Sequence, residues 1–198
     1  MTSLNDRVRI VSAEILSDDW YLLKKYTFDF QRHDGTWQRL SREAYDHGDG
    51  AAVLLYNRQK QTIILTRQFR LPVFINSGDG VLTEVAAGLL DGEDPARRVC
   101  KEAEEETGYR ISHVKKVFEA WMSPGCVTEK LHLFVAEYQD EDKQSSGGGL
   151  EEEGEDLEVL EIPFGQAFQA MQRGEIQDAK TIMLLQYAAL NQLMPLSV

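Results

Sequence analysis

Short apolar runs separated by turn-forming residues constrain this chain more than any other feature of its sequence. Runs of this length are typical of β-strands, and only three segments place apolar residues at helical spacing. Strands are expected over residues 8–16, 20–32, 37–46, 51–56, 62–69, 81–87, 114–121, 132–138 and 157–162. Helices are expected over residues 95–107, 164–173 and 179–194. Because strands and helices interleave irregularly, the sequence predicts an α+β fold, with a mixed β-sheet flanked by helices.

The beginning of the chain is expected to form a small antiparallel unit ahead of the main body. Its strand-like segments end near residue 46, and the turn-forming run 33–36 separates two of them. A sheet this small buries little surface of its own and needs another surface to pack against. We therefore expect an N-terminal antiparallel β subdomain over residues 1–46 and a main domain over residues 47–198.

Charge and composition argue against several classes of protein. The 198 residues carry a net charge of −12, and an acidic surface repels phosphate backbones, so nucleic-acid binding is not expected. No apolar run approaches the ~18–20 residues of a membrane-spanning helix, and the first residues lack the apolar run of a signal peptide. The two cysteines, Cys100 and Cys126, cannot form a disulfide framework. These observations favour a cytoplasmic protein without a membrane partner.

An acidic, glycine-rich segment stands apart from the rest of the chain. Residues 139–155 contain Gly147–Gly149 and a dense set of Asp and Glu. Such a composition does not build a core, so we expect a mobile, solvated loop here.

The stretch 88–109 holds the residues with the clearest chemistry. Asp94 suits the N-cap of a helix and Gly108 suits its end. At 100° per residue, one face of this helix gathers three carboxylates: Glu102, Glu105 and Glu106. Like charges at such spacing destabilise a helix by ~0.2–0.5 kcal/mol per pair. A bound Mg²⁺ ion, which prefers oxygen ligands, is one explanation of this cluster. Taken by itself, an acidic helix face is more often simply solvated.

The same stretch resembles the signature of the Nudix hydrolase superfamily. The matching residues are Gly88, Glu93, Lys101, Glu102, Ala103, Glu105, Glu106 and Gly108. Two departures stand out: the loop between Gly88 and Glu93 is one residue shorter than in the pattern, and Lys101 replaces an arginine. Lysine keeps the charge but loses the planar fork of the guanidinium. The resemblance implies an α/β/α sandwich.

Segments outside this signature resemble the nucleoside-diphosphate-sugar branch of the superfamily, a sister of the ADP-ribose pyrophosphatases. They include REAYDHGDGAAVLLYN, LTRQFRLPV, MSPGCVTEKLHLFVAEY and DAKT, so the resemblance covers nearly the whole chain. In that branch the N-terminal strands swap between subunits, which implies a homodimer. The implied reaction is Mg²⁺-dependent hydrolysis of the pyrophosphate bond of a nucleotide sugar, with Mn²⁺ as an alternative ion. GDP-mannose, cleaved to GMP and mannose 1-phosphate, is the expected substrate.

Two alternatives to this function stay open. One is an ADP-ribose pyrophosphatase that produces AMP and ribose 5-phosphate. The other is a non-catalytic nucleotide-binding module, against which the intact set of carboxylates argues.

The resemblance also implies which residues form the site. The implied metal ligands are the Ala87 carbonyl, Glu102, Glu106 and Glu155. The implied catalytic residues are Glu105 and a loop glutamate, either Glu155 or Glu153, because this loop is longer than the pattern. The implied substrate contacts are Trp20, Ser41, Arg42, Glu43, Arg70, Ala87, Gly88, Leu89, Glu129 and Lys180. Trp20 and Ser41 stand where the pattern has Tyr and Lys, so contacts with the base are expected to differ.

Overall fold

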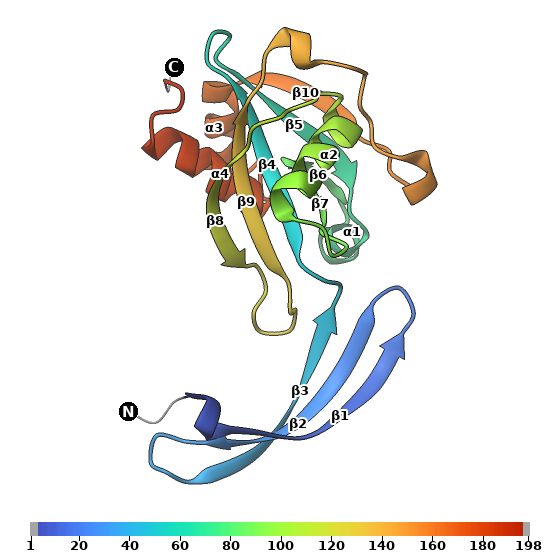
Figure 1. Cartoon of the computed structure of the whole chain (residues 1–198), viewed down its shortest axis with the longest axis vertical. Coiled ribbons are helices and arrows are strands. Elements are labelled where there is room, and N and C mark those ends of the chain that lie inside the picture. The colour runs from blue at the N-terminus through green and yellow to red at the C-terminus, as the bar shows by residue number, and fades with distance from the viewer. Residues whose placement is uncertain (1–3, 196–198) are drawn as a thin grey trace. The chain divides into compact units, whose positions relative to one another are not determined.

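The computed structural model describes residues 4–195, apart from the side chains of Leu4 and Glu153. Its strands are β1 (Val8–Asp18), β2 (Leu22–Gln31), β3 (Trp37–Asp46), β4 (Gly50–Asn57), β5 (Thr62–Phe69), β6 (Val81–Glu84), β7 (Ala86–Leu89), β8 (Lys115–Trp121), β9 (Lys130–Glu137) and β10 (Glu158–Pro163). Its helices are α1 (Leu71–Ser77), α2 (Pro95–Thr107), α3 (Phe164–Gln172) and α4 (Ala179–Leu190), labelled in Figure 1. Single 3-10 turns form at Leu4–Arg7, Asp140–Asp142 and Glu151–Glu153.

The chain divides into two compact units, and the first joins residues up to Asp49 with the segment Trp121–Lys130. Strands β1, β2 and β3 form an antiparallel sheet in that order. The segment Trp121–Lys130 is hydrogen-bonded to β3, since the Tyr45 amide donates to the Cys126 carbonyl at 2.8 Å. Nearly all of β1 is exposed, including its apolar side chain Ile15. This unit therefore leaves a large part of its apolar surface uncovered.

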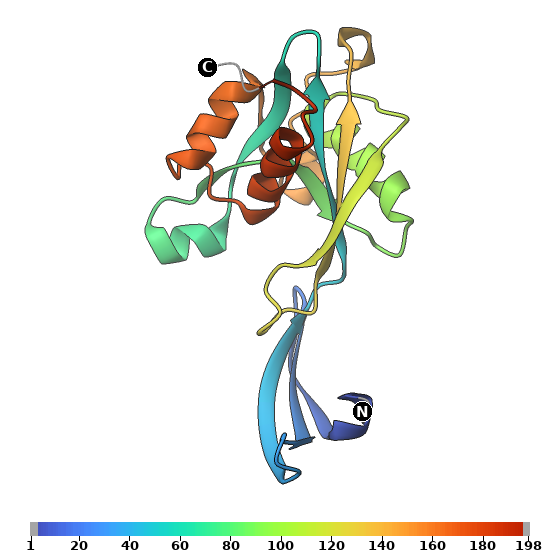
Figure 2. The ribbon, with the colours of Figure 1, turned by 90° about the vertical axis from the view of Figure 1, so that its left-hand side faces the viewer.

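The second unit is a mixed sheet between two layers of helices. The strand order is β10-β5-β4-β9-β8, with β6 paired to β5 and β7 paired to β4. The β4–β9 pair is parallel, whereas β4 pairs antiparallel with β5 and with β7. Helix α2 covers one face of the sheet, and α3 and α4 lie on the other (Figure 2). This arrangement confirms the predicted sandwich of helices around a mixed sheet.

The core of this unit forms where α2 meets the sheet. Val99 and Ala103 of α2 are fully buried against Val53 of β4 and Phe134 of β9. These two α2 residues belong to the inward face that helical spacing predicts. None of the helices within residues 4–195 is long and apolar enough to cross a membrane.

The structure departs from the sequence prediction in several elements. Helix α4 ends at Leu190, four residues before the predicted end at residue 194. The strand expected over residues 81–87 is split at Val85, whose amide donates to the Thr181 hydroxyl at 2.9 Å instead of to a neighbouring strand. Helix α1 was not predicted, because it buries none of its side chains and so lacks an amphipathic pattern. The segment with Gly147–Gly149, predicted to be a mobile solvated loop, instead packs against the end of α2.

Candidate active site

Helix α2 places two glutamates in the interior of the protein. It begins where predicted, since the Asp94 carboxylate accepts the amides of Ala96 and Arg97, both at 3.1 Å. Thirteen residues later the helix ends at Gly108, in the left-handed conformation. Between these caps Glu102 and Glu106 are 4% and 1% exposed. The helix face that the sequence marks as acidic is therefore turned inward.

Strand β7 forms the wall against which these carboxylates pack. The Ala87 amide donates to Oε2 of Glu106 at 3.3 Å. A Cβ atom at Gly88 would overlap with the Glu102 carboxylate, so only glycine leaves that carboxylate its place. The carbonyl of Leu89 accepts a hydrogen bond from the Arg98 guanidinium at 3.0 Å. The structure thus brings the predicted residues Ala87 and Gly88 against the α2 glutamates and Leu89 against Arg98 of the same helix.

Positive charge balances only one of the two buried carboxylates. Arg98 lies 2.5 Å from Oε1 of Glu102, and both side chains are largely buried. Glu106 has a pKa well above its usual value, first because of burial and then because of the charges of Glu102 and Glu155. The charge of Arg70 opposes this rise but does not cancel it. Glu106 is therefore a carboxylate held where its negative charge is costly.

A second charged cluster joins two predicted substrate contacts around Glu84. Arg70, which follows β5, lies 2.7 Å from Oε2 of this glutamate, and Lys180 of α4 lies 3.3 Å from Oε1. The Glu84 side chain is 3% exposed. The sequence analysis missed Glu84, although a charged residue inside the apolar run VLTEVAA was a usable signal. The Glu84 carboxylate thus holds Arg70 at one of its oxygens and Lys180 at the other.

Helix α4 fixes the position of Lys180 through its N-cap. Asp178 accepts the Thr181 amide at 2.9 Å, and it also pairs with Lys180 at 3.0 Å. The buried hydroxyl of Thr181 accepts the Val85 amide. These bonds join α4 to the junction between β6 and β7.

The loop carboxylate Glu155 lies near the same site. Its Oε2 accepts the Leu150 amide at 2.9 Å, and its charge contributes to the raised pKa of Glu106. Glu105 is half-buried on α2. The side chain of Glu153 lies outside the described part of the structure.

The remaining predicted substrate contacts belong to the N-terminal unit. Trp20 is 79% exposed, and Glu129 is half-buried in the segment Trp121–Lys130. A pocket of ≈ 350 Å³ in this unit is lined by Lys25, Ser41, Arg42, Glu43, Gly125 and Cys126. Ser41, Arg42 and Glu43 therefore share one hollow, as contacts of one ligand would require.

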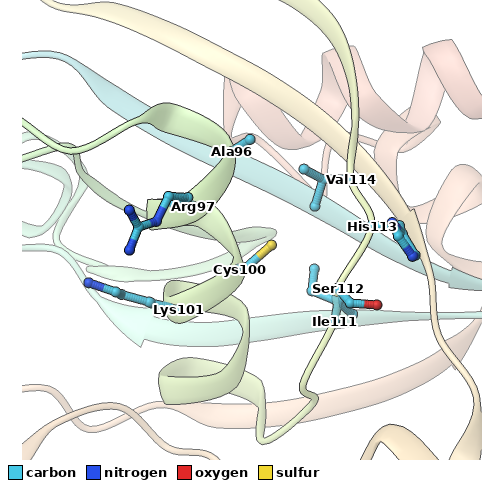
Figure 3. Close-up of a pocket in the computed structure, with 8 residues that line it drawn as sticks. All are labelled: Ala96, Arg97, Cys100, Lys101, Ile111, Ser112, His113 and Val114. Carbon is cyan, nitrogen blue, oxygen red and sulfur yellow. The ribbon is translucent and has the colours of Figure 1, made fainter.

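Another pocket lies on the side of α2 away from its buried glutamates. It has a volume of ≈ 520 Å³ and opens between α2 and the segment 111–114. Figure 3 shows Cys100 pointing into it from the helix, with His113 and Val114 on the opposite side. Burial raises the pKa of the Cys100 thiol, which disfavours the nucleophilic thiolate form.

The donor chemistry at α2 suits a hard divalent cation. Within residues 4–195, no three side chains of His, Cys, Asp or Glu are arranged to hold a metal ion. Two oxygen donors are nevertheless in place, at Glu102 and Glu106, and the pKa of Glu106 is raised first by burial and then by the negative charges of Glu102 and Glu155. A divalent cation would remove that repulsion, and Mg²⁺ completes its shell with waters and substrate oxygens. The residues present therefore fit Mg²⁺.

Comparison with known protein families assigns this fold and this site to a class. Residues 46–185 match the family described as "NUDIX domain". Residues 7–45 match the family described as "GDP-mannose pyrophosphatase NudK N-terminal domain". The chain therefore belongs to the Nudix hydrolase family, which confirms the resemblance seen in the sequence.

Curated relatives narrow the comparison to one kind of enzyme. A GDP-mannose pyrophosphatase of Pectobacterium atrosepticum is 52% identical over 186 residues, which cover 93% of this chain and 95% of the relative. One from Klebsiella pneumoniae is 49% identical, covering 97% of this chain and 96% of the relative. A crystal structure of an ADP compounds hydrolase has a TM-score of 0.72 at 17% identity, covering 98% of this chain and 97% of that one. At that identity the likeness shows the fold alone.

Proposed function

We propose that this protein hydrolyses the pyrophosphate bond of GDP-mannose and releases GMP and mannose 1-phosphate. Support comes from relatives named for that activity, which are about as long as this chain and up to 52% identical. The observation that carries the proposal is the buried pair Glu102 and Glu106, whose charge repulsion matches the need of a metal site. The neighbouring cations Arg70 and Lys180 would supply positive charge to the diphosphate oxygens that do not contact the metal.

The proposed metal is Mg²⁺, with Mn²⁺ as a substitute. Glu102, Glu106, Glu155 and the Ala87 carbonyl would hold it. Bound there, Mg²⁺ supplies positive charge against the diphosphate oxygens and makes water more acidic. Gly88 and Leu89 would line the pocket next to this metal.

In the proposed reaction, water attacks one phosphorus atom and the bond from that phosphorus to the bridging oxygen breaks. A carboxylate must accept the proton that the attacking water loses. Glu155 is the proposed acceptor, with Glu105 and Glu153 as the other glutamates within this acidic region. Arg70 and Lys180 would bind the phosphate oxygens and offset the charge on the leaving group.

The N-terminal subdomain, residues 1–46, is proposed to dimerise with a second copy, and residues 47–198 to form the hydrolytic domain. The family matches at residues 7–45 and 46–185 support this division. Exposed apolar side chains on β1, such as Ile10 at 60% and Ile15 at 58%, favour burial against a partner. Trp20, Ser41, Arg42, Glu43 and Glu129 would contact the nucleotide in such a dimer. The proposed location is the cytoplasm, consistent with two free cysteines among the described residues.

The test compares Glu106→Gln with Glu104→Gln. Both change a glutamate of α2, but Glu104 pairs with Arg110 and is not part of the proposed site. Release of GMP and mannose 1-phosphate from GDP-mannose would be measured with Mg²⁺ and with EDTA. We expect the Glu106 variant and the EDTA sample to lose at least ~100-fold in rate, and the Glu104 variant to keep it. Equal rates in all samples would refute the metal site.

A substrate panel separates the expected activity from its nearest alternative. Specificity constants for GDP-mannose, ADP-ribose and ADP-glucose would be ranked under the same conditions. GDP-mannose is expected to rank first. A higher specificity constant for ADP-ribose would identify the protein as an ADP-ribose pyrophosphatase that uses the same reaction. Binding without turnover would identify it as a non-catalytic nucleotide-binding module.

A further inference from the structure

The C-terminal end of α2 is covered by the glycine-rich segment. The last carbonyls of a helix have no hydrogen-bond donor within the helix. Here, amide groups of the following chain donate to them. The Gly148 amide donates to the Glu106 carbonyl at 2.9 Å, and the Gly149 amide donates to the Glu105 carbonyl at 3.2 Å. The Gln144 amide donates to the Gly108 carbonyl at 2.7 Å. The segment is thus bonded to the backbone at the end of α2, including that of the buried Glu106.

Two of the three glycines leave no room for a side chain. Gly147 has φ +67°, and a Cβ atom there would lie 2.5 Å from the Glu106 carbonyl oxygen, which belongs to the helix backbone and cannot move aside. Gly149 has φ +83°, and its Cβ would lie closest to Cδ1 of Leu157 and 2.6 Å from both Cβ and Oε2 of Glu155. The absence of a side chain therefore permits both close approaches.

The far side of the same segment fixes Glu155. The Leu157 amide donates to the Gly148 carbonyl at 3.1 Å, and the Glu155 amide donates to the Leu150 carbonyl at 3.2 Å. The Glu155 carboxylate accepts the Leu150 amide in return. Residues 150–155 thus form a closed turn whose two ends are attached to the glycine segment.

We propose that Gly147 and Gly149 are positioning residues that hold the Glu155 carboxylate in register with the glutamates of α2. This inference rests on the proposed function and names the part of the loop that acts on the site. The bonds to Glu105 and Glu106 set the position of the glycine segment along the helix, and the contact between Gly149 and Glu155 sets the position of the carboxylate on the segment.

The structure offers a matched control in Gly154. This glycine has φ +73°, close to the values at Gly147 and Gly149, but nothing lies within 4 Å of its Cβ position. Gly154→Ala therefore imposes the same backbone strain without the steric overlap. A difference between Gly149→Ala and Gly154→Ala reports the steric overlap with Leu157 and Glu155 together. The comparison with Glu155→Gln then isolates the part that acts through the carboxylate.

The experiment is a double-mutant cycle between Gly149→Ala and Glu155→Gln in the full-length protein. With GDP-mannose and Mg²⁺, we expect Gly149→Ala to lower kcat ~10–100-fold with KM little changed, because a misplacement of about 1 Å costs up to ~100-fold. In the Glu155→Gln background the same substitution should cost less than about threefold, since the carboxylate it displaces is already gone. Gly154→Ala should keep kcat within about threefold of wild type.

Metal binding gives a readout without turnover. Titration of Mn²⁺ into the metal-free protein, followed by calorimetry, should show weaker binding in Gly149→Ala and in Glu155→Gln, with no further loss in the double variant. Equal losses from Gly149→Ala in both backgrounds, or equal effects at Gly149 and Gly154, would overturn the inference. A wild-type protein that binds Mn²⁺ but leaves GDP-mannose intact would instead refute the proposed function.

Folding is checked separately, by thermal unfolding of every variant. If Gly149→Ala does not fold, Gly147→Ala carries the same cycle, because it displaces the segment from the side of α2. Non-additivity with Glu155→Gln supports the inference there too, and full additivity overturns it.

Discussion

Glu106→Gln is expected to stabilise the metal-free protein although it removes the proposed activity. The variant keeps the shape of the side chain, and its amide oxygen can still accept the Ala87 amide that now lies 3.3 Å from the carboxylate. It removes a buried carboxyl group, whose pKa is raised by burial and by the charges of Glu102 and Glu155. Removing such a group should increase the free energy of unfolding by about 1–3 kcal/mol.

For a chain of this size, that gain corresponds to an increase in Tm of about 2–12 °C. The assay is thermal unfolding by circular dichroism in EDTA, with Glu104→Gln as the control. Glu104 pairs with Arg110 at the surface, where their side chains are 35% and 64% exposed, so its loss should change stability by less than about 1 kcal/mol. A Tm below wild type for the Glu106 variant would refute the reasoning.

The same charge predicts an unusual dependence on pH. A carboxyl group with a raised pKa binds its proton more tightly in the folded than in the unfolded chain, so this group stabilises the fold less as pH rises. Its effect begins near the unfolded value of 4.5 and is complete above the raised pKa of Glu106. The Tm difference between Glu106→Gln and wild type should therefore widen with increasing pH. A constant difference from pH 4.5 to pH 8 would contradict the assignment of the charge to Glu106.

Three further predictions address the metal, the charged cluster and the N-terminal unit. Mg²⁺ at about 100 times its Kd should stabilise the wild type by ~2.7 kcal/mol and Glu106→Gln by much less; calorimetric unfolding that shows equal stabilisation would exclude this glutamate as a ligand. Glu84→Gln should destabilise the fold by about 1–2 kcal/mol, because two cations lose a shared carboxylate that is 3% exposed; a urea midpoint equal to wild type would refute this. Ile15→Lys should shift a dimer towards monomer in light scattering, since Ile15 is 58% exposed in the single chain; an unchanged mass would place the interface elsewhere.

Local signals in the sequence predicted the element that carries the chemistry. Asp94, Pro95 and Gly108 mark the ends of α2 without reference to any other part of the chain, so its bounds agree with the prediction. The acidic spacing likewise identified Glu102 and Glu106. That both would be buried did not follow from their spacing, because burial depends on how β7 packs against them.

Features built from distant segments could not be predicted in this way. The break between β6 and β7 depends on Thr181, which is 96 residues away from its partner Val85. The glycine-rich segment has the composition of a solvated loop, and only its bonds to the helix carbonyls give it a fixed place. Helix α1 buries no side chain, so the sequence carries no periodicity from which to infer it.

Because residues 150–155 form a closed turn, the length of this loop can change without moving the Glu155 carboxylate. Both attachments, at Gly148 and at Leu150, lie at the base of the turn, whereas the tip around Glu152 and Gly154 is exposed. Insertions or deletions at the tip would change a solvent-facing spacer and leave the base unaltered. A change of loop length at the tip is therefore compatible with the same placement of the carboxylate.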